Sequence, residues 1–156
     1  MAKQVKKRAN KDYPEDGIKK GNYYWYAALK TGPRSSVVIR SLSPIKRYKL
    51  TTSEFLSKIW MIEDAYIPNI SCLEDVEILI EALQNIYEDC QNSFGNLPEG
   101  LRNGPTGEML DTRSNGCERA VNDFETIFGE WSDAVDDEDF DEDEYIESAR
   151  SVSIEY

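Results

Sequence analysis

Two long stretches of the chain repeat apolar residues at alternating steps of three and four. This spacing aligns the repeated residues along one face of an α-helix and is typical of helices that pack against each other. A loop rich in Gly and Pro, residues 95–105, separates the two stretches. The sequence therefore predicts an antiparallel helical hairpin. The repeated residues are Leu73, Val76, Ile80, Leu83, Tyr87, Cys90 and Phe94, and then Leu110, Ser114, Cys117, Val121, Phe124, Phe128 and Trp131.

Helix start signals precede this hairpin. Thr51 and Glu54 have the spacing of a capping box, which predicts a further helix from about residue 51 to 65, before Pro68. Ser71 and Glu74 repeat the spacing at the start of the first repeated stretch. Gly116 costs the last helix about 1 kcal/mol relative to Ala, so it marks either a close crossing or a bend.

A block of four aromatic residues, Tyr23–Tyr26, indicates β-structure ahead of the helices. We expect a strand over 18–30, a turn at Thr31–Arg34 and a return strand over 35–42. Alternation puts Tyr23, Trp25, Ala27 and Leu29 on one face of the hairpin, and Tyr24, Tyr26 and Ala28 on the other. One face should pack on the helices, and the other needs a cover or a ligand.

The predicted fold class is α+β, with an aromatic β-hairpin packed on an antiparallel bundle of about three helices. One domain is expected over 17–132, with the hairpin at 17–50 and the helices at 51–132. Residues 1–16 lack periodicity and are predicted to be a disordered basic arm. Residues 133–156 are predicted to be an acidic tail, since nine acids between residues 136 and 147 repel one another. The end of the tail, 151–156, alternates like a strand, which either returns as a third strand of the hairpin or stays loose.

Charge is divided unevenly along the chain. Residues 1–50 hold thirteen Lys and Arg against three Asp and Glu, a net of +10. Residues 51–156 hold five Lys and Arg against twenty-seven Asp and Glu, a net of −22. Such asymmetry suggests an electrostatic partner for one part of the chain, or contact between the two parts.

The residue types argue against most enzyme classes. The sequence has no histidine, which removes the commonest general base and most catalytic zinc sites. It has no glycine-rich phosphate loop, and the acidic run lacks the calcium-loop pattern. The three cysteines lie far apart and fit buried positions in a reducing compartment. We expect a non-enzymatic protein of the cytoplasm, without cofactor, metal, signal peptide or membrane span.

Two candidate surfaces follow. The first is basic and aromatic and combines stacking rings with cations that suit phosphates; its residues are Lys19, Lys20, Tyr24, Trp25, Tyr26, Arg34, Arg40, Lys46 and Arg47. The alternative is that these rings are core. The second surface is acidic and is formed by Asp136, Asp137, Glu138, Asp139, Asp141, Glu142, Asp143 and Glu144.

These surfaces support three hypotheses. The favoured one is an accessory protein that binds another protein through its acidic helices, as an inhibitor, an adaptor or a nucleic-acid mimic. The alternative is binding of single-stranded nucleic acid by the basic hairpin. A third is a structural protein whose apolar seams are completed in an oligomer; the sequence leaves the oligomeric state open.

Four short segments also occur together in a known order: KGNYYWY from Lys20, LTTSEF from Leu50, LPEGL from Leu97 and GPTGEML from Gly104. Over residues 17–128 the chain resembles a family of small, uncharacterised proteins of phage and bacterial genomes. The resemblance implies a phage or mobile-element accessory protein and no particular activity. Some members of that family carry paired cysteines ahead of the aromatic strand; 11–17 has none here, so metal binding is not implied.

Overall fold

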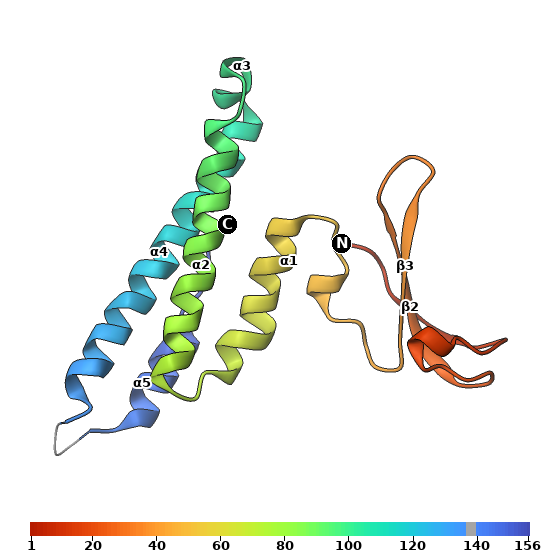
Figure 1. Cartoon of the computed structure of the whole chain (residues 1–156), viewed down its shortest axis with the longest axis horizontal. Helices are drawn as coiled ribbons and strands as arrows, with labels where there is room; N and C mark the ends of the chain where they lie inside the picture. Colours follow the sequence, from red (N-terminus) through yellow and green to blue (C-terminus); the bar gives the residue numbers. More distant parts are fainter. Residues whose placement is uncertain (137–139) are drawn as a thin grey trace. The chain divides into compact units, whose positions relative to one another are not determined.

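The computed structural model describes residues 1–136 and 140–156 and divides into two compact units, Met1–Trp60 and Met61–Tyr156. The fold class is α+β as predicted, with one three-stranded antiparallel sheet and a set of helices (Figure 1). The single domain predicted over 17–132 spans parts of both units, which divide between Trp60 and Met61. We therefore describe a β-unit, Met1–Trp60, and a helical unit, Met61–Tyr156.

The sheet of the β-unit has the strand order β1-β2-β3, with β1 at Val5–Arg8, β2 at Tyr23–Lys30 and β3 at Ser36–Ser41. The predicted hairpin is confirmed as β2 and β3, which pair from Trp25 opposite Ser41 to Lys30 opposite Ser36. The third strand is not the end of the chain but the segment predicted as a disordered arm. That segment also contains the 3-10 turn η1, Pro14–Asp16.

β1 has no apolar alternation and all four of its residues are exposed, so a strand could not be predicted here from the sequence. It is held by backbone and flanking contacts. Val5–Arg8 pairs with β2, and the side-chain amide of Gln4 exchanges two hydrogen bonds with the backbone of Ile45, at 3.1 and 2.9 Å. Ala9, just after the strand, is buried. An edge strand rich in Lys is a usual way to keep a sheet from pairing with other chains.

Each face of the sheet carries its own small core, at opposite ends of β2. Ala27 and Leu29 pack with Ile45 and Leu50, which come from the segment after β3. On the other face Tyr24 packs with Ala9 and Ile18 from the 9–22 segment, and Tyr13 lies against Tyr24 with 5.7 Å between ring centres; these residues form the second core. Both faces are therefore covered in part by the β-unit itself.

The β-unit ends with the 3-10 turn η2 (Arg47–Lys49) and helix α1 (Glu54–Met61). The predicted cap at Thr51 is corrected, because Ser53 caps this helix: its hydroxyl accepts the amide of Leu56 at 3.3 Å. Thr51 instead accepts the amide of Ser53 at 3.1 Å, a turn that leads into the helix. Ser is also the better N-cap residue of the two, and Ser53 lies directly before the first helical residue, Glu54.

In the helical unit, a π-helical turn η3 (Ile62–Tyr66) and a 3-10 turn η4 (Ile67–Asn69) lead to α2 (Leu73–Gly95). The capping partner of Ser71 is Asp75 rather than the predicted Glu74. The Asp75 carboxylate accepts the Ser71 amide at 2.8 Å and its hydroxyl at 2.9 Å. Cys72 is the N-cap residue, so Asp75 occupies the third helical position, from which a side chain reaches back.

The predicted helical hairpin consists of α2 and α4 (Pro105–Ala134), which lie side by side, with the short α3 (Glu99–Arg102) at the turn between them (Figure 1). Along α4 the buried residues include the predicted Ser114, Cys117, Val121, Phe124 and Trp131. Along α2 the buried residues differ from the predicted seam at two positions, where Leu79 is buried in place of Ile80 and Ile86 in place of Tyr87. The buried residues are Val76, Leu79, Leu83, Ile86 and Cys90. The side-chain amide of Gln91 donates to the hydroxyl of Ser114 at 2.7 Å and links the two helices.

The acidic tail is corrected as well, because much of it forms helix α5, Glu142–Ser151. Asp141 caps this helix by accepting the Asp143 amide at 3.1 Å. Carboxylates in a first turn interact favourably with the helix dipole, which offsets their mutual repulsion. Tyr145 stacks on Trp131 of α4, with ring centres 5.9 Å apart, and fixes α5 to that helix.

The final residues, Val152–Tyr156, form no strand and instead cross α4. Ile154 is buried, and the backbone carbonyl of Glu155 lies directly on Gly116, where any Cβ would overlap it. The side chain of Arg119 reaches Glu155 at 3.4 Å. Of the two alternatives for Gly116, a close crossing or a bend, the structure shows a close crossing, and the crossing element is the C-terminal segment, which we call the C-terminal strap.

Candidate functional site

The four consecutive aromatic residues of β2 differ widely in exposure. Tyr24 is buried, and this burial raises the pKa of its hydroxyl. Trp25 packs half-buried against the core formed around Ala27, and Tyr26 is half-buried on the opposite face. Tyr23 is the ring that faces solvent, with 61% of its surface exposed. Tyr24, Trp25 and Tyr26 therefore do not form one stacking surface, and Tyr23, which the candidate surface left out, is the most accessible.

The candidate cations are spread over several segments of the β-unit. Lys19 and Lys20 are exposed between β1 and β2, Arg34 is exposed in the β2–β3 turn, and Lys46 is exposed after β3. The remaining two are partly covered by aromatic rings.

Arg40 and Arg47 are the partly covered cations. The guanidinium of Arg40 lies 4.5 Å from the ring centre of Tyr13 and 3.4 Å from the carboxylate of Asp16. Its Nε is buried without a hydrogen-bond partner in the part of the chain that the structure describes. Arg47 lies 5.5 Å from the ring centre of Trp60.

The division of charge coincides with the division of the fold. The β-unit, Met1–Trp60, holds fourteen Lys and Arg against four Asp and Glu, a net of +10. The helical unit, Met61–Tyr156, holds four Arg against twenty-six Asp and Glu, a net of −22. Each compact unit thus has a field of a single sign.

The arginines of the helical unit support its fold and neutralise few carboxylates. Arg102 donates to the backbone carbonyls of Leu97 and Gly95, at 2.9 and 2.5 Å. Arg150 donates to the carbonyl of Ile70 at 2.6 Å. Because twenty-six carboxylates face only four arginines, most of the acidic surface has no cation in this unit to compensate it.

The candidate acidic residues fall in three places. Asp136 follows α4, and Asp137, Glu138 and Asp139 lie outside the described residues. Asp141, Glu142, Asp143 and Glu144 form the cap and first turn of α5. These last four carboxylates therefore have a structural role at a helix start.

A hollow of about 110 Å³ lies between η3 and α2 in the helical unit. It is lined by apolar groups and one carboxylate, and its residues are Ala65, Tyr66, Asn69, Asp75, Ile78 and Leu79. Ile78 is 52% exposed and Tyr66 is 43% exposed, although both are large and apolar. Glu74 and Glu81 stand within one helical turn of Ile78, so carboxylates surround it. The seam predicted from sequence does not single out Ile78, because Leu79 also lies off that seam and is buried.

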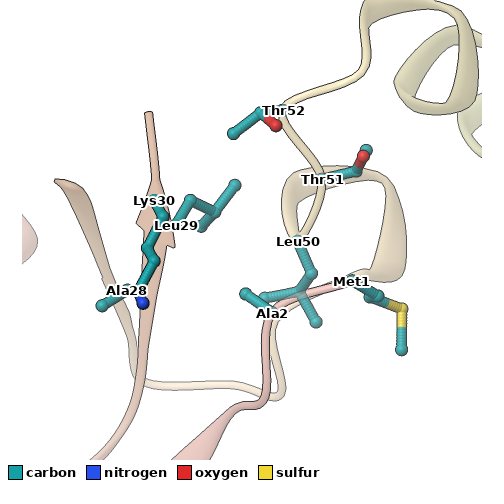
Figure 2. Close-up of a pocket in the computed structure, with 8 residues that line it drawn as sticks. All are labelled: Met1, Ala2, Ala28, Leu29, Lys30, Leu50, Thr51 and Thr52. Atoms are coloured by element: carbon teal, nitrogen blue, oxygen red, sulfur yellow. The ribbon is translucent and has the colours of Figure 1, made fainter. Parts of the chain in front are cut away.

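A second hollow, of about 360 Å³, belongs to the β-unit and opens to solvent. Figure 2 shows Ala2 and Leu50 on one side of it and Ala28, Leu29 and Lys30 of β2 on the other. The amide of Ala2 donates to the carbonyl of Leu50 at 2.7 Å, so the N-terminal residues form part of its wall. Its lining includes no carboxylate, thiol or imidazole.

Among the described residues no three Cys, Asp or Glu side chains gather as a metal-binding group. No helix in that part of the chain is long and apolar enough to cross a membrane. Comparison with protein-family models, with curated proteins and with solved structures finds no match.

Proposed function

We propose that this chain is a non-enzymatic binding protein. Its helical unit docks on a basic surface of another protein, and the centre of the docking site on this chain is formed by Tyr66 and Ile78. The observation that carries the proposal is the exposed apolar hollow at these two residues, set in an acidic surface. Protein interfaces commonly combine an apolar centre, which supplies most of the binding energy, with a polar rim.

The rim at this hollow is negative. Glu74, Asp75 and Glu81 lie three or four residues from Ile78 along α2 and so share its side of the helix. The hydrogen bonds from Ser71 lower the pKa of Asp75, so this carboxylate stays charged at any physiological pH. A partner with one or two apolar side chains between Lys or Arg residues fits this arrangement.

The net charge of −22 on the helical unit supports the same proposal. A field of one sign speeds the encounter with an oppositely charged partner, and the rate falls steeply as salt increases. If the partner's basic surface normally binds DNA or RNA, the protein acts as a nucleic-acid mimic. The resemblance noted above favours a phage or host protein as this partner.

The experiment is affinity capture from the host with and without nuclease, using three full-length proteins: the natural chain, Ile78→Lys and Leu101→Lys. Leu101 is the matched control because it is 50% exposed, is also in the helical unit and lies outside the hollow. We expect one nuclease-resistant partner that elutes with salt, is retained by Leu101→Lys and is lost by Ile78→Lys.

Two results would overturn this proposal. Equal retention by both variants would show that the partner does not use the hollow. Loss of the partner after nuclease treatment would show that nucleic acid, and not a protein, is bound.

A further inference from the structure

The face of the sheet that carries Tyr26 has an exposed region that runs across all three strands. In the register of the sheet, Val5 of β1 pairs with Tyr26 of β2, and Tyr26 pairs with Arg40 of β3. The next row toward the β2–β3 turn consists of Ala28 and Val38. Residues directly opposite each other in an antiparallel sheet point to the same side, so these residues share one face.

This face is apolar at its centre and basic at its edges. Val5 and Val38 are 38% and 37% exposed, and Ala28 is also exposed. We call the region the Tyr26 face and define it by Val5, Lys7, Tyr26, Lys30, Val38 and Arg40. Lys7 lies 3.8 Å above the ring centre of Tyr26. Lys7 of β1 and Lys30 of β2 are exposed cations, whereas Arg40 of β3 is half-buried and lies 3.4 Å from the carboxylate of Asp16.

The opposite face is less continuous. There the core of Ala27, Leu29, Ile45 and Leu50 covers the middle of the hairpin. This core separates the exposed ring of Tyr23 from exposed Val37 near the turn. On the Tyr26 face the covering residues lie at the Tyr24 end, where Tyr26 packs half-buried against them, and beyond Tyr26 the residues Ala28, Lys30 and Val38 are exposed.

We propose that the Tyr26 face binds single-stranded nucleic acid. Charge complementarity favours this occupant, since the β-unit carries a net charge of +10. Single-strand sites combine cations along the backbone with rings or apolar groups on which bases stack, which is the composition of this face. A cation–ring contact at the surface is weak, so the Lys7 ammonium can leave the Tyr26 ring for a phosphate while a base takes the ring.

An acidic peptide is the other polyanion to consider. A peptide that adds to a sheet binds along an edge strand through backbone hydrogen bonds. The Tyr26 face instead presents a ring and valines in the middle of three paired strands, where no backbone group is open. The face therefore fits a ligand with flat bases better than one with an extended backbone.

The test uses neighbouring residues of one strand that point to opposite faces. Lys6 pairs with Trp25 and Lys7 pairs with Tyr24, so Lys6→Gln and Lys7→Gln remove the same charge from opposite sides of β1. Each full-length variant is titrated into a fluorescein-labelled oligothymidylate of ~12 nucleotides at low salt, and binding is followed by polarisation. We expect Lys7→Gln to weaken binding several-fold and to reduce the slope of log affinity against log salt by about 0.7. Lys6→Gln should weaken binding less than Lys7→Gln, and at ~0.15 M salt, where the Debye length is about 8 Å and a charge on the far face is screened, it should change the affinity less than ~2-fold.

A second pair on β3 checks the result. Val38→Glu places a carboxylate on the Tyr26 face and should abolish binding, whereas Val37→Glu places it on the other face, where binding should persist. Both valines are exposed, and near-UV circular dichroism confirms that each variant is folded. If a valine variant does not fold, the lysine pair decides.

No binding at low salt, or equal losses within the lysine pair, would overturn the proposal. So would tighter binding of duplex DNA or of a polyglutamate peptide than of the single strand. The proposal is independent of the function proposed for the helical unit, because the two sets of variants lie in different units.

Discussion

Gly116→Ala is the substitution whose effect the structure defines most sharply. The added methyl group would overlap the backbone carbonyl of Glu155, which cannot rotate away as a side chain would. Either the C-terminal strap leaves α4 or the helix shifts. We expect the strap to leave, because the helix is held along its length by α2, and buried Ile154 would then become exposed.

The expected magnitude combines two opposing terms. Replacing Gly by Ala inside a helix stabilises it by about 1 kcal/mol. Exposing the side chain of Ile154 costs about 1.5–3 kcal/mol. The Arg119–Glu155 ion pair is lost too, but such exposed pairs contribute little. Gly116→Ala should therefore lower the free energy of unfolding of the helical unit by about 0.5–2 kcal/mol.

The assay is urea unfolding followed by the far-ultraviolet circular dichroism of the helices. Gly129→Ala in the same helix is the control, because nothing lies within 4 Å of the position where its Cβ would be. It should raise the free energy of unfolding by about 1 kcal/mol. In a chain that ends at Ser151, which lacks the strap, Gly116→Ala should also become stabilising. Equal stabilisation by Gly116→Ala and Gly129→Ala in the full chain would refute the contact between the strap and α4.

Two further predictions concern titratable groups of α2 and α4. The hydrogen bonds from Ser71 lower the pKa of Asp75 below its usual 3.8, so Asp75→Asn should cost about 1 kcal/mol at neutral pH. The difference in the free energy of unfolding between the natural chain and Asp75→Asn should fade as the pH falls below 3.8 and the native carboxyl is protonated. Urea unfolding at a series of pH values from acid to neutral measures this difference, and a difference that stays constant with pH would contradict the prediction. Burial raises the pKa of Cys117 to about 12, so at pH 8 a thiol reagent should leave Cys117 and buried Cys90 unmodified and react with half-buried Cys72. The free energy of unfolding should fall as the pH rises above 9, because the thiol of Cys117 ionises in the unfolded chain before it ionises in the native protein. Rapid labelling of Cys117 in the native protein would contradict its burial.

Elements with strong local signals were predictable from sequence. The three-and-four spacing identifies α2 and α4, and the Gly/Pro turn at 31–34 identifies the hairpin of β2 and β3. The cost of Gly116 in a helix indicated a close crossing or a bend, and the structure shows the crossing. In each case the information lies within a few residues of the element concerned.

Elements that depend on distant partners were not predictable in this way. β1 is polar and exposed, and it becomes a strand because β2 offers an edge and Ile45 binds Gln4. α5 forms within an acidic run because Tyr145 has Trp131 to stack on. Charge repulsion argues against that helix when the sequence is read alone.

The exposure of the candidate surfaces also depends on distant partners and was predictable only in part. Alternation along β2 correctly assigns Tyr24 and Trp25 to opposite faces, but it does not reveal which end of each face is covered. The covers come from Ile18 on one side and Leu50 on the other, and neither has a local signal. The exposed Ile78 also depends on fold, because only the packing of α2 shows which stripe is buried.

The position of the C-terminal strap has a consequence for synthesis of the protein on the ribosome. All three strands of the sheet lie within the first 41 residues, so the sheet can assemble while most of the chain is still unmade. The face of α4 at Gly116, which the strap covers, stays exposed until residues 152–156 leave the exit tunnel. Domains commonly fold in the order in which they are made. The helical unit therefore completes its packing after the sheet, and during translation the face of α4 at Gly116 is accessible to a chaperone or a second nascent chain until the strap covers it.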